Sequence, residues 1–201
     1  MLDLISFSTE RFAIAHLRQT HEHLEGAKIE KVKLLYAASM IHLSLHTLLI
    51  MAAYSESGLS VLKKESRERL EAKPLTEHEN IQTKDFKRLL DEFLDQKDSR
   101  LADLKAKISN VKEQIVLLAK FRNLLEHPKP GAVNGFTKTL ILDSIEIDAM
   151  IVADFFTYLA RENLTIRSYE AEAQKLVKCI IDLCVEVRTD KGSEVINKEK
   201  F

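Results

Sequence analysis

The feature that most constrains the fold of this chain is an uncharged run from Leu34 to Ser55, LLYAASMIHLSLHTLLIMAAYS. It is long enough to cross a bilayer as a helix. It also carries polar side chains that are costly in lipid without partners, namely Ser39, His42, Ser44, His46 and Thr47. No second run of this kind is present in the sequence to pair with it. A helix buried on nearly all sides by other helices explains the run at lower cost, so we expect the centre of a helical bundle and no membrane.

The composition indicates helix throughout the chain. Only five Gly and three Pro occur among 201 residues, and straight-chain residues such as Leu, Lys and Glu lose little rotamer freedom in a helix. The length suits one domain with a sizeable core. The formal net charge of −1 provides no global basic field for non-specific nucleic-acid binding, although a local basic groove, or one between subunits, stays open.

Two further features bear on cellular location. Cys179 and Cys184 lie five residues apart in a helical pattern, so their side chains diverge too far for a disulfide or a shared metal ion. We expect both to be buried thiols in a reducing compartment. The start of the sequence, MLDLISFSTERF, has no basic residue before an apolar core and no small-residue cleavage site, so it does not resemble a signal peptide. We therefore expect a cytoplasmic protein.

The spacing of apolar and helix-breaking residues predicts an all-α fold, an up-and-down bundle of about five helices. We expect a single helical domain over residues 1–188, followed by a polar C-terminal tail at 189–201. The expected helices cover approximately residues 9–25, 27–54, 84–127, 144–161 and 165–188. Asp143 with Glu146 three residues later resembles a capping box that would open the fourth helix.

Helical spacing also predicts the core positions. In the first helix these are Phe12, Ala15, Leu17 and Leu24, and in the last they are Leu176, Val177, Ile180, Ile181 and Cys184. The third helix carries an apolar stripe with alternate steps of three and four residues, formed by Leu101, Leu104, Ile108, Val111, Ile115 and Leu118. We expect this stripe to be ordinary bundle core, with a dimer seam as the alternative.

Arg122 takes the next position of the same stripe, where an aliphatic residue is expected. A guanidinium in a core or an interface is expensive unless it is paired or binds an anion. Its rigid fork of donors suits a phosphate better than the point charge of a lysine would. Arg122 is therefore a candidate phosphate-binding residue.

His127 follows five residues later, directly before Pro128. The proline disfavours helical geometry at His127, so we expect the helix to end there. A histidine in such a place can exchange protons near neutral pH. Arg122 and His127 do not share a helix face, whereas Asn123 and His127 do. A site that uses both Arg122 and His127 is more easily assembled in a groove between two copies, which points to a homodimer.

The stretch Arg122-Asn123-Leu124-Leu125-Glu126-His127 resembles the Arg, polar residue, three variable residues, His pattern of the HEPN superfamily, the higher-eukaryote and prokaryote nucleotide-binding domains. The context agrees with the resemblance, since a long apolar helix precedes the motif and further helices follow it. The resemblance implies a small all-α domain, often dimeric, and for many members a metal-independent endoribonuclease of toxin–antitoxin or abortive-infection systems. It covers the architecture of most of the chain but only this hexapeptide in residues.

The resemblance also implies roles for individual residues. His127 would act as general base or acid on the ribose 2′-hydroxyl or the leaving oxygen, and Arg122 would hold the scissile phosphate. Asn123 would orient the imidazole or the phosphate, and Glu126 and Lys129 would contact the substrate. The partners implied are RNA, a second copy of the chain and an antitoxin. No cofactor and no metal ion are implied, because an internal 2′-hydroxyl nucleophile needs neither.

Other interpretations of the motif stay open. Arg122 and Glu126 are four residues apart and could form a plain surface ion pair, and His127 near a helix end is favourable through the helix dipole alone. One alternative is a non-catalytic helical module that binds a nucleotide or a protein partner. Another is a structural dimer in which Arg122 is only a seam residue.

The remaining histidines are expected to be structural. His42 and His46 have the i, i+4 spacing of zinc ligands, but no glutamate follows His42 and no third ligand is apparent. We expect them to be core or interface histidines with satisfied hydrogen bonds. His16, His21 and His23 do not share one face of the first helix, and we expect them on a solvated surface.

Overall fold

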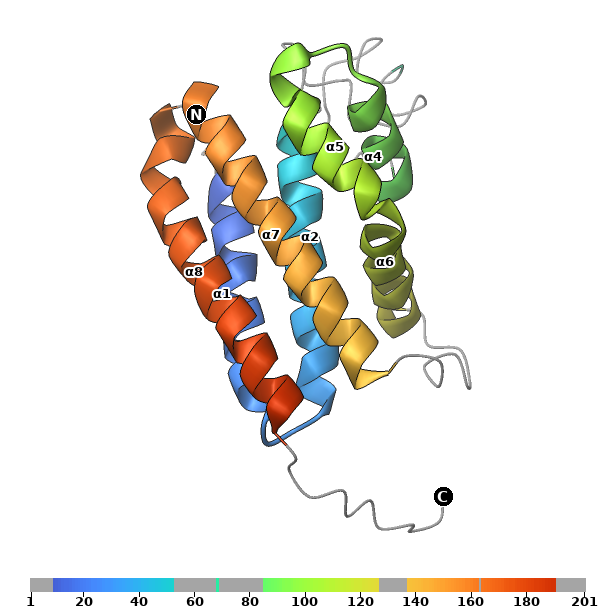
Figure 1. Cartoon of the computed structure of the whole chain (residues 1–201), viewed down its shortest axis with the longest axis vertical. Coiled ribbons are helices and arrows are strands. Elements are labelled where there is room, and N and C mark those ends of the chain that lie inside the picture. Colours follow the sequence, from blue (N-terminus) through green and yellow to red (C-terminus); the bar gives the residue numbers. More distant parts are fainter. Residues whose placement is uncertain (1–8, 53–67, 69–84, 127–136, 163, 191–201) are drawn as a thin grey trace.

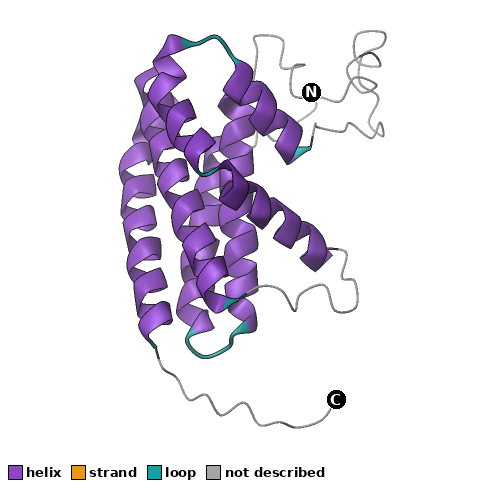
Figure 2. Cartoon of the chain, turned by 45° about the vertical axis from the view of Figure 1, so that its right-hand side comes forward, coloured by secondary structure: helices purple, strands orange, loops and turns teal. Residues whose placement is uncertain are grey.

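The structure, a computed structural model, describes residues 9–52, 68, 85–126, 137–162 and 164–190. Regular structure within these residues is entirely helical, which confirms the all-α prediction (Figure 2). The elements are α1 (Thr9–Ala27), α2 (Val32–Ala52), α4 (Phe86–Asp95), the 3-10 helix η2 (Ser99–Leu101), α5 (Ala102–Asn110), α6 (Lys112–Glu126), α7 (Lys138–Glu162) and α8 (Leu164–Thr189).

Four long helices form a closed ring in which α1 packs on α2, α2 on α7, α7 on α8, and α8 on α1 (Figure 1). Polar contacts between α1 and α8 occur in the same order along both helices, so these two run parallel: Arg11–Tyr169, Arg18–Glu172 and Lys28–Glu186. Since α1 with α2 and α7 with α8 are antiparallel neighbours, α2 and α7 are parallel too. This differs from the expected up-and-down order, because the long stretch that carries α4, α5 and α6 returns the chain to the starting end before α7.

Helix α2 lies at the centre, as the uncharged run that begins at Leu34 predicts. It packs against α1, α7, α6 and α4. Its buried side chains include Leu34, Ile41, Leu45, Leu48 and Leu49. Among the described helices it is the one long and apolar enough to span a membrane, and 56% of its apolar window is buried inside the structure. Burial by neighbouring helices therefore accounts for its apolar sequence.

The expected long third helix is instead three shorter ones. Asp85 begins α4 by accepting a hydrogen bond from the Arg88 backbone N–H at 3.0 Å. A break follows at residues 96–98, where the Asp98 carboxylate accepts from the Arg100 backbone N–H at 2.9 Å. A second break at Val111, whose φ is −119°, separates α5 from α6. Local backbone geometry, with one side-chain hydrogen bond at Asp98, thus divides a pattern that periodicity alone predicts to be continuous.

The apolar stripe survives these breaks as core. Its members Leu101, Leu104, Ile108, Ile115 and Leu118 are buried within one chain, and Val111 is partly buried. The expectation of bundle core is confirmed. The side chains are enclosed by α7, α4 and α2 rather than left for a second copy.

The start of α7 lies earlier than expected. The Thr137 hydroxyl accepts a hydrogen bond from the Leu140 backbone N–H at 3.1 Å and caps the helix. Asp143 lies inside α7 and forms no capping box. Asp143 and Glu146 instead receive the Arg188 guanidinium of α8, at 2.7 and 3.0 Å.

The core predictions hold in part. Leu17 and Leu24 are fully buried, but Phe12 is 42% exposed and Ala15 also faces outward, because the buried face of α1 runs through Ala13 and Ile14. In α8 the buried residues are Val177, Ile180 and Cys184, while Leu176 and Ile181 are partly buried. Cys179 and Cys184 are free thiols. Burial raises the pKa of Cys184 to about 12, which fits an inert core thiol.

We predict that Thr137→Ala lowers the free energy of unfolding by about 1 kcal/mol, because it removes the cap of α7. Asp143→Ala should cost less than about 0.5 kcal/mol, because it removes only one half-exposed ion pair. Urea denaturation of both variants measures the difference. A larger loss of unfolding free energy for Asp143→Ala than for Thr137→Ala would indicate that Asp143 caps α7 after all.

Candidate functional site

The structure places residues 122–126 of the predicted motif on the last turns of α6. Arg122 is half-buried there. The backbones of Asn123 and Glu126 belong to α6, but their side chains lie outside the described part. His127 and Lys129 lie outside the described residues altogether. Arg122 is therefore the one predicted site residue whose side-chain environment is described.

Arg122 lies within electrostatic range of two other helices. Burial, and then the Arg122 charge, lower the pKa of His16 on α1. The same guanidinium contributes to lowering the pKa of His46 on α2. Because α6 packs against α2, Arg122 faces the bundle and not only solvent. This is the geometry expected of an arginine at a core position of the stripe.

Behind His46 lies a buried pair of titratable groups. The His42 Nδ1 on α2 is 3.5 Å from the Asp148 Oδ2 on α7, and the two side chains are 1% and 0% exposed. Neither carboxyl oxygen of Asp148 has a hydrogen-bond partner. Burial raises the pKa of Asp148 well above its usual range. Burial thus favours the neutral form of this carboxyl, which faces the His42 imidazole.

The aromatic ring of Phe86, the first residue of α4, packs against the imidazole rings of His42 and His46 on α2. The His42 and Phe86 ring centroids are 4.3 Å apart and those of His46 and Phe86 are 5.5 Å apart, both in edge-on arrangements. The His42 and His46 rings themselves are 6.4 Å apart. Together, Arg122, His46, His42, Asp148 and His16 form what we call the polar cluster.

The environment of His46 strongly disfavours its charged form. Its pKa falls to about 4, chiefly through burial and then through the charges of His42 and Arg122, while Asp85 opposes the shift. Its Nε2 is buried and has no hydrogen-bond partner, and the same holds for Nδ1 of His16. A buried polar atom without a partner costs roughly 1–3 kcal/mol. Such a cluster does not serve stability, which makes it a candidate functional site.

Sequence reasoning did not identify this cluster. It placed His16 on a solvated surface, whereas part of its ring is buried. It expected satisfied hydrogen bonds for His42 and His46, and for His46 Nε2 that expectation is wrong. It did not single out Asp148. Two features of the sequence could have indicated the cluster. One is the i, i+4 histidine pair in the uncharged run, and the other is Asp148 near the start of the apolar stretch IDAMIVADFF.

The cluster does not form a metal site. Among the described residues no three His, Cys, Asp or Glu side chains come together in a way that could hold a metal ion. His42, His46 and Asp148 belong to two helices, but only the His42–Asp148 pair is in close contact.

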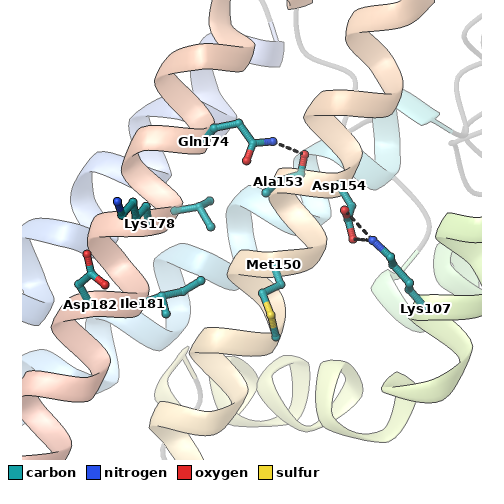
Figure 3. A pocket seen from close by; sticks show the side chains of 9 residues that line it. Lys107, Met150, Ala153, Asp154, Gln174, Lys178, Ile181 and Asp182 are labelled. Carbon is teal, nitrogen blue, oxygen red and sulfur yellow. Dashed lines mark hydrogen bonds and ion pairs between the residues drawn. The ribbon is translucent and has the colours of Figure 1, made fainter.

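A shallow groove lies elsewhere, between α5, α7 and α8 (Figure 3). Its volume is about 390 Å³. The Lys107 ammonium meets the Asp154 carboxylate across it at 2.8 Å, and the Gln174 amide donates to the Ala153 carbonyl at 3.1 Å. Met150 on its floor is 49% exposed. The groove contains no residue of the polar cluster or of the predicted motif, and these polar groups on its walls are paired with each other.

Comparison with known proteins adds no family: no family model matches this chain, and no curated protein or solved structure does either. The candidate site is therefore defined by Arg122 and the polar cluster.

We predict that Asp148→Asn stabilises the protein increasingly as the pH rises. A carboxyl whose native pKa is raised keeps its proton in the folded state, so wild-type stability falls from about pH 4 upward, by at most about 1.4 kcal/mol per pH unit. The uncharged amide has no such loss. Unfolding free energies of wild type and variant between pH 4 and pH 8 measure the effect, and Asp154→Asn on the same helix is the control. Destabilisation by Asp148→Asn that grows with pH would instead mean an ionised aspartate paired with protonated His42.

Proposed function

We propose that this chain is a metal-independent endoribonuclease of the HEPN type. The observation that carries the proposal is the position of Arg122. It lies one turn from the end of α6 and is half-buried. Its charge contributes to lowering the pKa of His16 and of His46, which lie on two other helices. An arginine that served only as a polar surface residue would lie on the exposed face of the helix. His127, the proposed proton-transfer residue, follows directly after Glu126 in the sequence.

The proposed reaction is an internal transesterification. The ribose 2′-oxygen attacks the neighbouring phosphorus as its proton passes to a base, and the bond from phosphorus to the 5′-oxygen breaks as that oxygen takes a proton from an acid. His127 is proposed for one of these proton transfers. The products are a 2′,3′-cyclic phosphate and a 5′-hydroxyl. No external nucleophile and no oxidant is consumed.

Arg122 is proposed to bind the scissile phosphate. Its guanidinium offers a planar pair of donors to the two non-bridging oxygens and offsets the charge that develops on them. Partial burial strengthens that interaction, because the surrounding apolar side chains exclude water. Asn123 is proposed to orient the imidazole or the phosphate, and Glu126 and Lys129 to contact the RNA.

The wider setting belongs to the same proposal. A homodimer would bring the Arg122 and His127 residues of two copies to one groove, which solves the problem that they do not share a helix face. An antitoxin partner, a role in bacterial defence and a cytoplasmic location come with the HEPN resemblance. The rival function, a non-catalytic module that binds a nucleotide or a protein partner, would use the same guanidinium without His127.

We predict that purified protein cleaves single-stranded RNA of mixed sequence in the presence of EDTA and leaves 2′,3′-cyclic phosphate ends. Arg122→Ala and His127→Ala should each reduce the rate by at least about 10²-fold, since each removes a direct contribution to the transition state. Arg122→Lys should recover little, because the planar fork is lost while the charge remains.

The matched control is Arg88→Ala, which removes an exposed arginine paired with Glu92 on α4. It should leave cleavage within about twofold of wild type. Circular dichroism verifies that every variant is folded. Equal activity in wild type, Arg122→Ala and His127→Ala would refute this site. RNA binding that depends on Arg122 without any cleavage would favour the binding module.

A further inference from the structure

We propose that a second copy of this chain docks on the outer side of the helix pair α1 and α2, and that this contact forms the homodimer. The contact itself rests on the spacing, exposure and charge of residues along the two helices. That the second copy completes a site for RNA rests on the proposed function. The outer side of α1 and α2 faces away from α7 and α8, behind which the two helices lie in Figure 1.

Helix α2 presents an apolar stripe on this outer side. Neighbouring helices bury 56% of its apolar window inside the chain, and the remainder includes residues that recur at steps of three and four. That spacing places them on one helix face. Val32 and Tyr36 are 41% and 49% exposed. The residues that continue the stripe are partly buried, namely Met40, Leu43 and Thr47.

Helix α1 extends the same surface sideways. Phe12 is 42% exposed, and steps of four, three and four residues lead from it to His16, Gln19 and His23. The ring centroids of His23 and Tyr36 are 5.5 Å apart, so the two stripes lie side by side. We call the surface formed by both stripes the α1–α2 face.

The α1–α2 face has the polarity of an interface between copies. None of its residues is a lysine, arginine, aspartate or glutamate. The Arg18 side chain points elsewhere and pairs with Glu172 of α8. The Thr47 hydroxyl donates to the Leu43 carbonyl at 2.8 Å and therefore needs no water. A face without formal charge neither attracts a charged partner nor repels an identical copy.

The size of the α1–α2 face also suits a dimer. Helix α2 has 21 residues, so the helix pair is about 30 Å long and about 20 Å wide, which gives roughly 600 Å² before the relief of the side chains is counted. Stable interfaces bury about 800 Å² on each partner. A twofold contact uses the same patch on both copies, and two helix pairs stacked in this way form a four-helix arrangement. Exposed aromatic residues such as Tyr36 are typical of the centre of such contacts.

A lipid bilayer is the other apolar environment that this face could meet. The α1 stripe contains His16, Gln19 and His23. Their polar atoms would lose water in hydrocarbon without gaining partners. In a protein interface the same groups can bond to polar groups of the partner or to bridging water. A second copy is therefore the occupant that the composition of the face favours.

The α1–α2 face adjoins the helix of the candidate site. Helix α6, which carries Arg122, packs against α2, and His16 of the face is one of the histidines whose pKa the Arg122 charge helps to lower. Docking of a second copy on this face would place both α6 helices beside one interface. This deepens the proposed function, because Arg122 and His127 of two copies need such an arrangement to share a groove.

Sedimentation velocity of the full chain tests the contact. Wild type should sediment with twice the mass of one chain. Tyr36→Glu should raise the dissociation constant of the dimer by about 10²-fold or more, because it buries an unpaired charge in the interface. The matched control is Met150→Glu on α7, where the native side chain is also 49% exposed. It should leave the dissociation constant within about twofold of wild type, because it lies outside the interface. Circular dichroism verifies that each variant is folded.

Two results in sedimentation would overturn the proposal: a monomeric wild type, or a dimer that Met150→Glu disrupts and Tyr36→Glu does not. Vesicles of phosphatidylcholine and phosphatidylglycerol test the alternative. Flotation of wild type with them, abolished by Tyr36→Glu, would assign the face to a bilayer and also overturn the proposal.

RNA cleavage in EDTA by the same proteins separates this inference from the proposed function. A dimer that Tyr36→Glu disrupts, in a protein that cleaves no RNA, would confirm the interface and refute the endoribonuclease. Cleavage by a monomeric wild type would refute the interface and support the endoribonuclease.

Discussion

The burial of α2 is the constraint on which the rest of the structure depends. This helix carries no formal charge from Leu34 onward, and it packs against α1, α7, α6 and α4. The same burial makes every polar group on α2 expensive, because water cannot hydrate it. Ser39 and Thr47 resolve this by donating to carbonyls one turn earlier, and Ser44 donates to the Ala13 carbonyl of α1. The His46 Nε2, by contrast, is buried without a hydrogen-bond partner.

The buried imidazoles of His42 and His46 connect the fold to the candidate site. The His42 Nδ1 lies 3.5 Å from Asp148, and burial raises the pKa of that carboxyl. Burial also lowers the pKa of His46 to about 4, so its imidazole is uncharged at neutral pH. A core selected for stability alone would place aliphatic residues at these positions, since that exchange is commonly neutral or favourable. The cost of these buried polar groups is the reason to treat them as a candidate functional site.

Periodicity in the sequence was sufficient for the helical class, the central position of α2 and the buried face of the stripe from Leu101 to Leu118. It failed where local hydrogen bonds decide the outcome. Asp98 accepts from the Arg100 backbone N–H at a break inside what looks like one long helix, and Thr137 caps α7 ahead of the acidic pair at Asp143 and Glu146. The candidate site was predicted only through Arg122. The contact between His42 and Asp148 joins helices far apart in the sequence, and it depends on the packing of α2 against α7.

The single-turnover rate constant of RNA cleavage, measured in EDTA for wild type and Arg122→Gln, tests most directly whether Arg122 binds the reacting phosphate. The account predicts that Arg122→Gln, which keeps a polar side chain but removes the charge and the planar fork of donors, loses most of the rate. A rate constant equal to that of wild type would mean that Arg122 takes no part in the reaction, and the account would be wrong.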